Sequence, residues 1–231
     1  MATSALATQL KSFSDRHQWI GPTIWMLSSL YFLAQVFVGW VWKPPYSVIR
    51  NTISDLGNTA CGKYHQSYVC SPRHDVMDAV FVLLGLVMAS GSLLLYQEFT
   101  ERPRREQRAA LAGFTLMAFA GVGTMLVGLF PENTISYMHI TGAGIAIGGG
   151  NLGILILGLV LPLPEGLRGS MIGLSIVSIV ALICFASGHY FGIGGGTMER
   201  IAAYPETVWL IRFGLYISRN HFTQAGTPST A

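Results

Sequence analysis

Six apolar runs, each about as long as a membrane-spanning helix, constrain this chain more than any other feature. The hydrocarbon core of a bilayer is ~30 Å thick, and about 20 helical residues are needed to cross it. Only 11% of the 231 residues are charged, whereas soluble domains average about 25%. We therefore expect an all-α fold, a polytopic transmembrane helix bundle of six spans that forms one membrane domain over residues 1–231. The expected spans are residues 20–42, 76–96, 109–130, 140–161, 171–193 and 199–219.

The last run is the weakest of the six, because Pro205, Glu206 and Arg212 interrupt it. Five spans is the alternative, with this segment lying at the membrane interface. The residues before the first run do not resemble a signal peptide, and no small-residue cleavage site follows that run. We therefore expect residues 20–42 to be retained as a signal anchor.

Basic residues between the runs predict the orientation of the bundle. Cytoplasmic flanks of membrane helices carry an excess of Lys and Arg, and the short loop "ERPRREQR" at residues 101–108 is strongly basic. This loop predicts a multi-pass protein of the plasma membrane with both termini in the cytoplasm. Residues 43–75 then form an outer loop, and residues 220–231 form a flexible C-terminal tail.

Two cysteines, Cys61 and Cys70, lie close together in the outer loop, while Cys184 lies in an apolar run. Disulfides persist outside the cytoplasm, and the chain has no second cysteine pair to complete a zinc set. We expect a Cys61–Cys70 disulfide that staples the extracytoplasmic loop between the first two spans. Two free thiols, or half of a metal site, are the alternatives.

Reactive polar residues gather at the outer ends of four segments, namely His74, Asp78, His139, His189 and Glu199. His74 and Asp78 are four residues apart, so they share one face of a helix. His74, His139 and His189 could bind Zn²⁺, which takes imidazole ligands and activates water. Without a metal, all five would serve as catalytic acids and bases. Each residue also has a structural alternative, such as anchoring a helix or interacting with its dipole.

A second set of polar residues would contact a ligand. Asp55 and Arg200 belong to the outer end, and Asn151 and Arg212 lie deeper in their spans. An arginine in hydrocarbon costs about 2.5–3.5 kcal/mol on insertion scales. Arg212 therefore either faces a polar cavity beside Asn151 or extends to the inner headgroups. Small residues near Asn151 predict close helix packing, through the GxxxG pairs Gly144/Gly148 and Gly149/Gly153.

Several stretches of the sequence resemble one known family. They are "WKPPYSVIRNTISDLGNTAC", "VCSPRHDVMDAVFVLLG", a histidine that opens the fourth span, and "GGGTMERIAAYPETVWLIRFG". Together they resemble the DUF998 family of bacterial membrane proteins, and the resemblance runs from the first span to the sixth. It implies the multi-pass architecture and supplies no reaction.

Three kinds of function fit these features. The first is a protein with an outward-facing polar cavity that binds a membrane lipid or a lipid-linked ligand. The second is a membrane-embedded hydrolase, transferase or isomerase that acts on a lipid, using zinc or a histidine–carboxylate pair. The third is a small transporter. The sequence contains no phosphate-binding loop, zinc-finger spacing or RNA-binding signature, so we expect no nucleic acid partner, and the oligomeric state is left open.

Overall fold

The computed structural model describes residues 8–9, 11–12, 17–64 and 67–225, and most of them are helical. The helices are α2 (Ile20–Met26), η1 (Leu27–Ser29), α3 (Leu30–Trp40), η2 (Ser54–Gly57), α4 (His74–Tyr96), η3 (Gln97–Phe99), α5 (Arg104–Leu129), α6 (Ser136–Ala143), η4 (Gly144–Gly149), α7 (Gly150–Val160), α8 (Glu165–Ala186) and α9 (Gly195–Ala225). Strands β1 (Gly62–Tyr64) and β2 (Ser67–Val69) form an antiparallel hairpin.

Five helical rods in the described part of the chain are long and apolar enough to cross a membrane. They correspond to the first five expected spans. The first rod joins α2, η1 and α3, and the fourth joins α6, the π-helical turn η4 and α7. The rods are Ile20–Trp40, His74–Phe99, Arg104–Leu129, Ser136–Val160 and Glu165–Ala186.

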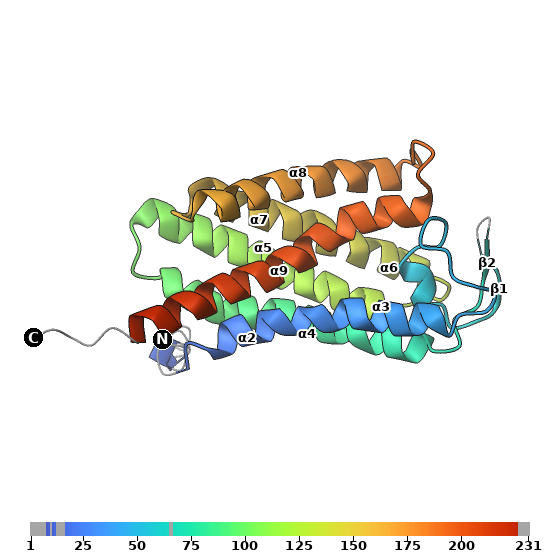
Figure 1. Ribbon diagram of the computed structural model, residues 1–231, viewed down its shortest axis with the longest axis horizontal. Coiled ribbons are helices and arrows are strands. Elements are labelled where there is room, and N and C mark those ends of the chain that lie inside the picture. The colour runs from blue at the N-terminus through green and yellow to red at the C-terminus, as the bar shows by residue number, and fades with distance from the viewer. Residues whose placement is uncertain (1–7, 10, 13–16, 65–66, 226–231) are drawn as a thin grey trace, which may run out of the picture.

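Helix α9 corresponds to the sixth expected span but is not among these five. It has 31 residues, which at ~1.5 Å per residue makes it about 46 Å long. The helix continues through Pro205 rather than starting or ending there. It runs along the whole bundle, in contact with α2 and with α8 (Figure 1). The helix also includes residues 220–225 of the expected flexible tail, and residues 226–231 lie outside the described part of the chain.

The bundle has two different ends, which we name by what they carry. The cap end holds the hairpin β1–β2, η2 and the start of α9 (Figure 1). The terminus end holds the start of α2 and the last turns of α9 (Figure 1). The loop between η3 and α5 and the first turn of α5, which together hold the basic "ERPRREQR" stretch, also lie at the terminus end (Figure 1).

Large apolar side chains cover the outside of the rods. Leu33, Val36, Phe119 and Ile183 are each more than 60% exposed. A soluble protein rarely leaves such extensive apolar surface in contact with water. These side chains therefore mark the surfaces that face lipid, as the apolar runs predict.

Glycine allows α5 and the fourth rod to approach closely. A Cβ atom at Gly153 would lie 2.7 Å from the carbonyl oxygen of Gly113, nearer than real Cβ atoms come. By contrast, a Cβ atom at Gly144 would meet nothing within 4 Å, and one at Gly148 would make only ordinary contact at 3.5 Å. The expected close packing is thus confirmed at Gly153 and wrong for the pair Gly144/Gly148.

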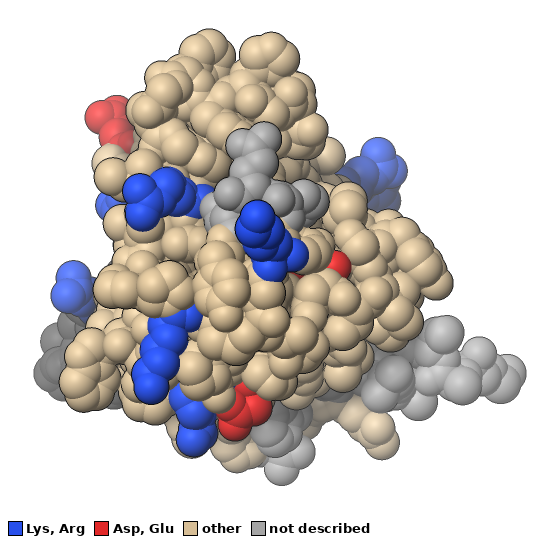
Figure 2. All heavy atoms as spheres, turned by 90° about the vertical axis from the view of Figure 1, so that its right-hand side faces the viewer, with Lys and Arg blue, Asp and Glu red and all other residues tan. Residues whose placement is uncertain are grey.

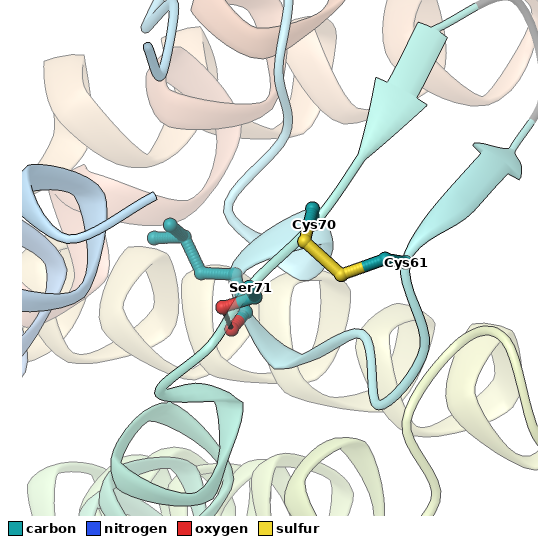
Figure 3. Close-up of a disulfide and its surroundings, with 4 residues drawn as sticks. Cys61, Cys70 and Ser71 are labelled. Carbon is teal, nitrogen blue, oxygen red and sulfur yellow. Dashed lines mark hydrogen bonds between the residues drawn. A yellow bond between two sulfur atoms is a disulfide. The ribbon is translucent and has the colours of Figure 1, made fainter. Parts of the chain in front are cut away.

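A disulfide between Cys61 and Cys70 closes the hairpin of the cap, as expected from the sequence (Figure 3). Residues Gly62 and Val69, which follow and precede the two cysteines, pair across the strands. The hydroxyl of the next residue, Ser71, donates a 2.6 Å hydrogen bond to the carbonyl oxygen of Leu56 (Figure 3). The disulfide is thereby tied to η2, which lies over the helices at the cap end.

Candidate functional site

The site forms where two distant segments of the chain meet, the loop before η2 and the first turn of α9. The backbone N–H groups of Gly196 and Thr197 donate to the carbonyl oxygen of Ile49, with N···O distances of 3.0 and 3.3 Å. A Cβ atom at Gly196 would overlap the backbone of Asn51. Glycine is therefore required for this contact, which joins the "WKPPYSVIRNTISDLGNTAC" and "GGGTMERIAAYPETVWLIRFG" stretches that carry the family resemblance.

Arg200 fastens the loop to α9. Its Nη1 donates to the carbonyl oxygens of Val48 at 3.0 Å and Asn51 at 2.9 Å, and its Nη2 donates to the hydroxyl of Tyr46. The guanidinium also lies over the Tyr46 ring, 5.5 Å from its centroid. Burial raises the pKa of Tyr46, so its hydroxyl stays a donor, to the carbonyl oxygen of Thr52 at 2.6 Å. Arg200, expected to contact a ligand, thus uses its donors to hold the cap.

Glu199 lies directly beside Arg200 but points inward, and only 6% of it is exposed. Its carboxylate accepts hydrogen bonds from the backbone N–H of Ile53 and, at 3.4 Å, from that of Ser54. The Ser54 hydroxyl lies 2.9 Å from the same carboxylate. The backbone of η2 therefore solvates a carboxylate that the bundle has removed from water.

Ser54 also contacts His139, which lies in the first turn of the fourth rod. The distance from Ser54 Oγ to His139 Nε2 is 3.0 Å, and His139 Nδ1 lies 3.0 Å from the carbonyl oxygen of Phe130. Because a carbonyl oxygen can only accept, Nδ1 must carry a proton. One serine hydroxyl thus bridges a buried carboxyl group and a buried imidazole, in the order Glu199–Ser54–His139.

Two further carboxyl groups, those of Asp55 and Glu132, lie near each other at the cap end outside the spans. Asp55 Oδ2 accepts from the backbone N–H of Thr52 at 3.0 Å, and Glu132 Oε1 accepts from Asn58 Nδ2 at 3.0 Å. Burial, and then the nearby charge and hydrogen bond of Asp55, raise the pKa of Glu132 to about 9. Glu132 therefore carries a proton at neutral pH.

The carboxyl groups of Asp55 and Glu199 are thus turned inward, and the surface of the cap is left mostly basic. Figure 2 looks onto the cap end and shows Lys and Arg side chains spread over it, with few acidic ones. The exposed basic residues of the cap include Lys43, Arg50, Lys63 and Arg73. The buried carboxyl groups of Asp55 and Glu199 therefore lie beneath a cap surface that is mostly basic (Figure 2).

His74 and Asp78 pair with each other and take no part in the Glu199–Ser54–His139 array. His74 Nδ1 lies 3.1 Å from Asp78 Oδ2, as their spacing on α4 predicts. The other oxygen, Oδ1, has no hydrogen-bond partner and fills the space that Gly57 leaves open. This pair therefore helps η2 pack against α4.

The expected metal site is not assembled in the described part of the chain. There, no group of three or more His, Cys, Asp or Glu side chains could hold a metal ion. His139 is buried, whereas His189 is exposed beyond the end of α8, where its Nδ1 lies 3.0 Å from Ser187 Oγ. The zinc set of His74, His139 and His189 is therefore corrected: the three histidines have separate partners.

A cavity of about 60 Å³ lies inside the bundle next to Ser54 and Glu199. It is walled by α4, α5, η4 and α9, and Glu206 and Thr207 also line it. A buried water needs about 10–15 Å³ of such volume, so the cavity has room for about four waters. Ligand pockets for small molecules measure roughly 300–1,000 Å³, so a lipid headgroup would need the cavity to expand.

The deeper polar residues divide between the interior and the surface. Asn151 is fully buried and its Nδ2 donates to Ile147 O of its own rod at 2.8 Å. Arg212 is exposed on the outside of α9. The orientation toward Asn151 is therefore wrong, and the position fits an arginine that extends to the headgroups.

Three residues of the site were missed or dismissed by sequence reasoning. Ser54 and Glu132 are not among the predicted site residues, because a serine before an aspartate is a common pair and no motif marks Glu132. Glu206 was read as an interruption of the sixth run, although it is buried and lines the cavity. The usable signal was Glu206 itself, since a carboxylate in an apolar run is rare without a function.

These features define a multi-pass helical membrane protein whose reactive groups are buried beneath a disulfide-stapled cap. Residues 26–216 match the family model described as "Protein of unknown function (DUF998)". Because this match covers most of the chain, the protein belongs to that family, and the resemblance found in the sequence is confirmed. No curated protein matches the chain, and no solved structure matches it.

Proposed function

We propose that α9 is the sixth span and that the cap end faces the outside of a plasma membrane. Helix α9 runs the length of the bundle, and the start of α2 and the end of α9 lie together, as an even number of spans requires (Figure 1). The basic loop at residues 101–108 lies at the terminus end, which favours the cytoplasm for that end. The Cys61–Cys70 disulfide lies at the cap end, which favours an oxidising exterior.

Thiol labelling tests this orientation. In a Cys184→Ser background, a membrane-impermeant thiol reagent added to intact cells after reduction should label Cys61 and Cys70. The matched experiment without reduction should give no label, because the disulfide protects both sulfurs. Labelling that requires broken membranes would place the cap in the cytoplasm and overturn the orientation.

We further propose that the protein handles protons, and that Glu199, Ser54 and His139 form a proton relay. The relay lies at the cap end of the cavity, which we call its roof. The observation that carries this proposal is the single hydroxyl of Ser54, 2.9 Å from Glu199 and 3.0 Å from His139. A serine has one proton to donate and can also accept. It can therefore pass a proton between its two neighbours without moving.

The transfer leaves the charge of the array unchanged. In one state Glu199 is a neutral acid that donates to Ser54, and the Ser54 hydroxyl donates to Nε2 of neutral His139. When both protons shift along these hydrogen bonds, Glu199 becomes a carboxylate and His139 becomes an imidazolium. Nδ1 stays protonated in both states, held by the carbonyl oxygen of Phe130. Because neither state creates net charge in the bundle, both avoid the cost of burying an unpaired ion.

A second candidate is acyl transfer with Ser54 as nucleophile. The 3.0 Å contact with His139, itself oriented by Phe130, resembles a nucleophile and its general base. However, an oxyanion hole needs free backbone donors beside the nucleophile. The N–H groups of Ile53 and Ser54 already bind the carboxylate of Glu199. This arrangement favours the relay.

Nitrogen NMR of the reconstituted protein tests the relay. With ¹⁵N-histidine labelling, His139 can be assigned by the signal lost in His139→Gln. Wild type should interconvert between a neutral form protonated on Nδ1 and an imidazolium. In Glu199→Gln, His139 should be seen only in its neutral form, because the amide cannot supply the proton.

The control for this experiment is Asp75→Asn, which removes an exposed acid near the cap. It should leave the His139 signals unchanged. Identical His139 titrations in wild type and Glu199→Gln would show that the two groups do not share a proton, and the relay would be rejected. Covalent labelling of Ser54 by a fluorophosphonate, lost in His139→Gln, would instead establish the acyl-transfer candidate.

A further inference from the structure

Glu206 is the polar group of the bundle that the relay leaves unexplained. It lies seven residues after Glu199 on α9, about two turns or ~10 Å farther from the cap. Only 5% of it is exposed, and its Oε1 atom has no hydrogen-bond partner. The carboxyl occupies the space that Gly150 leaves on α7, where a Cβ atom would overlap it. The chain has therefore made room for a carboxyl group and given it no partner.

The surroundings of Glu206 do not neutralise it. Among the described residues that line the cavity, the titratable ones are Tyr31, Glu199 and Glu206, and none is basic. Arg212 of α9 is exposed. On α8, Glu165 and Arg168 belong to the turn at the terminus end, and α7 carries no charged residue. A carboxylate isolated in this way is so costly that the group takes up a proton instead.

The cavity connects Glu206 to the relay. Residues 199 and 206 lie on the same face of α9, and both line the cavity together with Ser54 and Thr207. The volume of about 60 Å³ accommodates about four waters, each of which can make two to four hydrogen bonds. A short chain of waters thus fits between the roof and Glu206.

Aromatic side chains close the bundle on the side of Glu206 that faces the terminus end. Trp209 lies one turn beyond Glu206 and packs 5.2 Å from Trp25 and 4.8 Å from Phe213, measured between ring centroids. Trp25 and Phe213 are fully buried, and 1% of Trp209 is exposed. Protons can therefore approach Glu206 through the roof more easily than from the terminus end.

We propose that Glu206 is a proton-binding site in the interior of the membrane, loaded from the cap end through the cavity. The loading path rests on the proposed relay, whereas the binding site itself rests on the burial, the missing partner and the cavity. The ligand is the proton alone. Other oxygen-bearing side chains also line the cavity, namely Tyr31, Ser54, Thr124, Glu199 and Thr207, so the sodium and potassium arm of the test below separates a proton from a metal cation.

Infrared difference spectroscopy of the full chain in phospholipid vesicles tests both parts. Glu206→Gln should remove one C=O band of a neutral carboxylic acid, whereas Glu165→Gln, an exposed acid on α8, should leave that band in place. Gly150→Ala should shift the band, because the added methyl group displaces the carboxyl. Persistence of every neutral-acid band in Glu206→Gln, or loss of the band on adding sodium or potassium, would overturn the proton site.

The rate of deuterium exchange separates this proposal from the relay. On transfer to heavy water the Glu206 band should move to lower frequency, and Ser54→Ala should slow this exchange by roughly 10²-fold without changing the intensity of the band. An unchanged rate in Ser54→Ala would reject the relay while leaving the proton site intact. A band that never exchanges in wild type would show that the cavity does not connect Glu206 to water, and would reject loading through it.

Discussion

The cap half and the terminus half of the bundle use the same helices but different side chains. In the cap half, Glu199 and Ser54 line a cavity with room for water, and Ser54 also contacts His139. In the terminus half, Trp209 and Phe213 pack against residues of α2 and α5 with their rings in contact. Along α9, the buried side chains change within a single turn from the polar Glu206 and Thr207 to the aromatic Trp209. The difference indicates that water and protons enter this protein from one side.

The largest expected effect is on the aromatic cluster. Trp209→Ala should lower the free energy of unfolding by about 3–5 kcal/mol, the usual cost of truncating a buried aromatic side chain. Leu215→Ala on the lipid-facing side of the same helix is the control, because 40% of that leucine is exposed. Unfolding in detergent micelles measures both. Equal losses would mean that the terminus half is not closed by tight packing.

A substitution of Arg200 tests whether the stability of the cap depends on the hydrogen bonds that this residue donates to the loop, which we call the Arg200 clamp. Arg200→Lys should destabilise the protein by about 1–3 kcal/mol, because a lysine cannot reach several carbonyl oxygens at once and leaves buried acceptors unsatisfied. Arg212→Lys, on the exposed side of the same helix, should change stability by less than about 0.5 kcal/mol. Limited proteolysis by trypsin after Arg50 reports the loosening. A cap as resistant in Arg200→Lys as in Arg212→Lys would contradict the clamp.

A smaller effect is expected from pH at the Asp55–Glu132 pair. Because the pKa of Glu132 is raised from 4.5 to about 9, the folded protein binds this proton more tightly than the unfolded chain. The resulting stability is complete below about pH 4.5 and is lost as the pH rises toward 9. Allowing for solvent screening at a half-buried group, the loss should be on the order of 1 kcal/mol.

Glu132→Gln mimics the protonated state and should flatten this dependence. Thermal unfolding of wild type and variant at pH 5 and pH 9 measures the difference. A wild-type protein that becomes more stable than Glu132→Gln as the pH rises would reverse the sign and contradict the raised pKa of Glu132.

The sequence was sufficient for the helices, the disulfide and the depth of the site. Runs of apolar residues report length, so five spans and the helical nature of the sixth could be predicted. The segment ends that carry Glu199 and His139 set their common depth. The end of a helix within an apolar run is not encoded so simply: α8 ends at Ala186, which leaves His189 in an exposed turn, whereas His139 lies within α6 and is buried.

The remaining parts of the site depend on contacts that no local pattern records. Ser54 acquires its role only because α9 and the fourth rod bring Glu199 and His139 to either side of it. Glu206 is accommodated by the missing side chain of Gly150, on a different helix. Neither relation follows from spacing along the chain.

Water access to the two halves is the most direct test of the proposed one-sided path. In a Cys184→Ser background, Thr207→Cys places a thiol in the cavity and Phe213→Cys places one in the aromatic cluster. Silver ions are small enough to enter such a cavity, and they protect a thiol from later alkylation in denaturant. We expect silver added at the cap side to protect Cys at 207 and to leave Cys at 213 unprotected. Protection at both positions, or at neither, would contradict the proposal that protons reach the interior from the cap end alone.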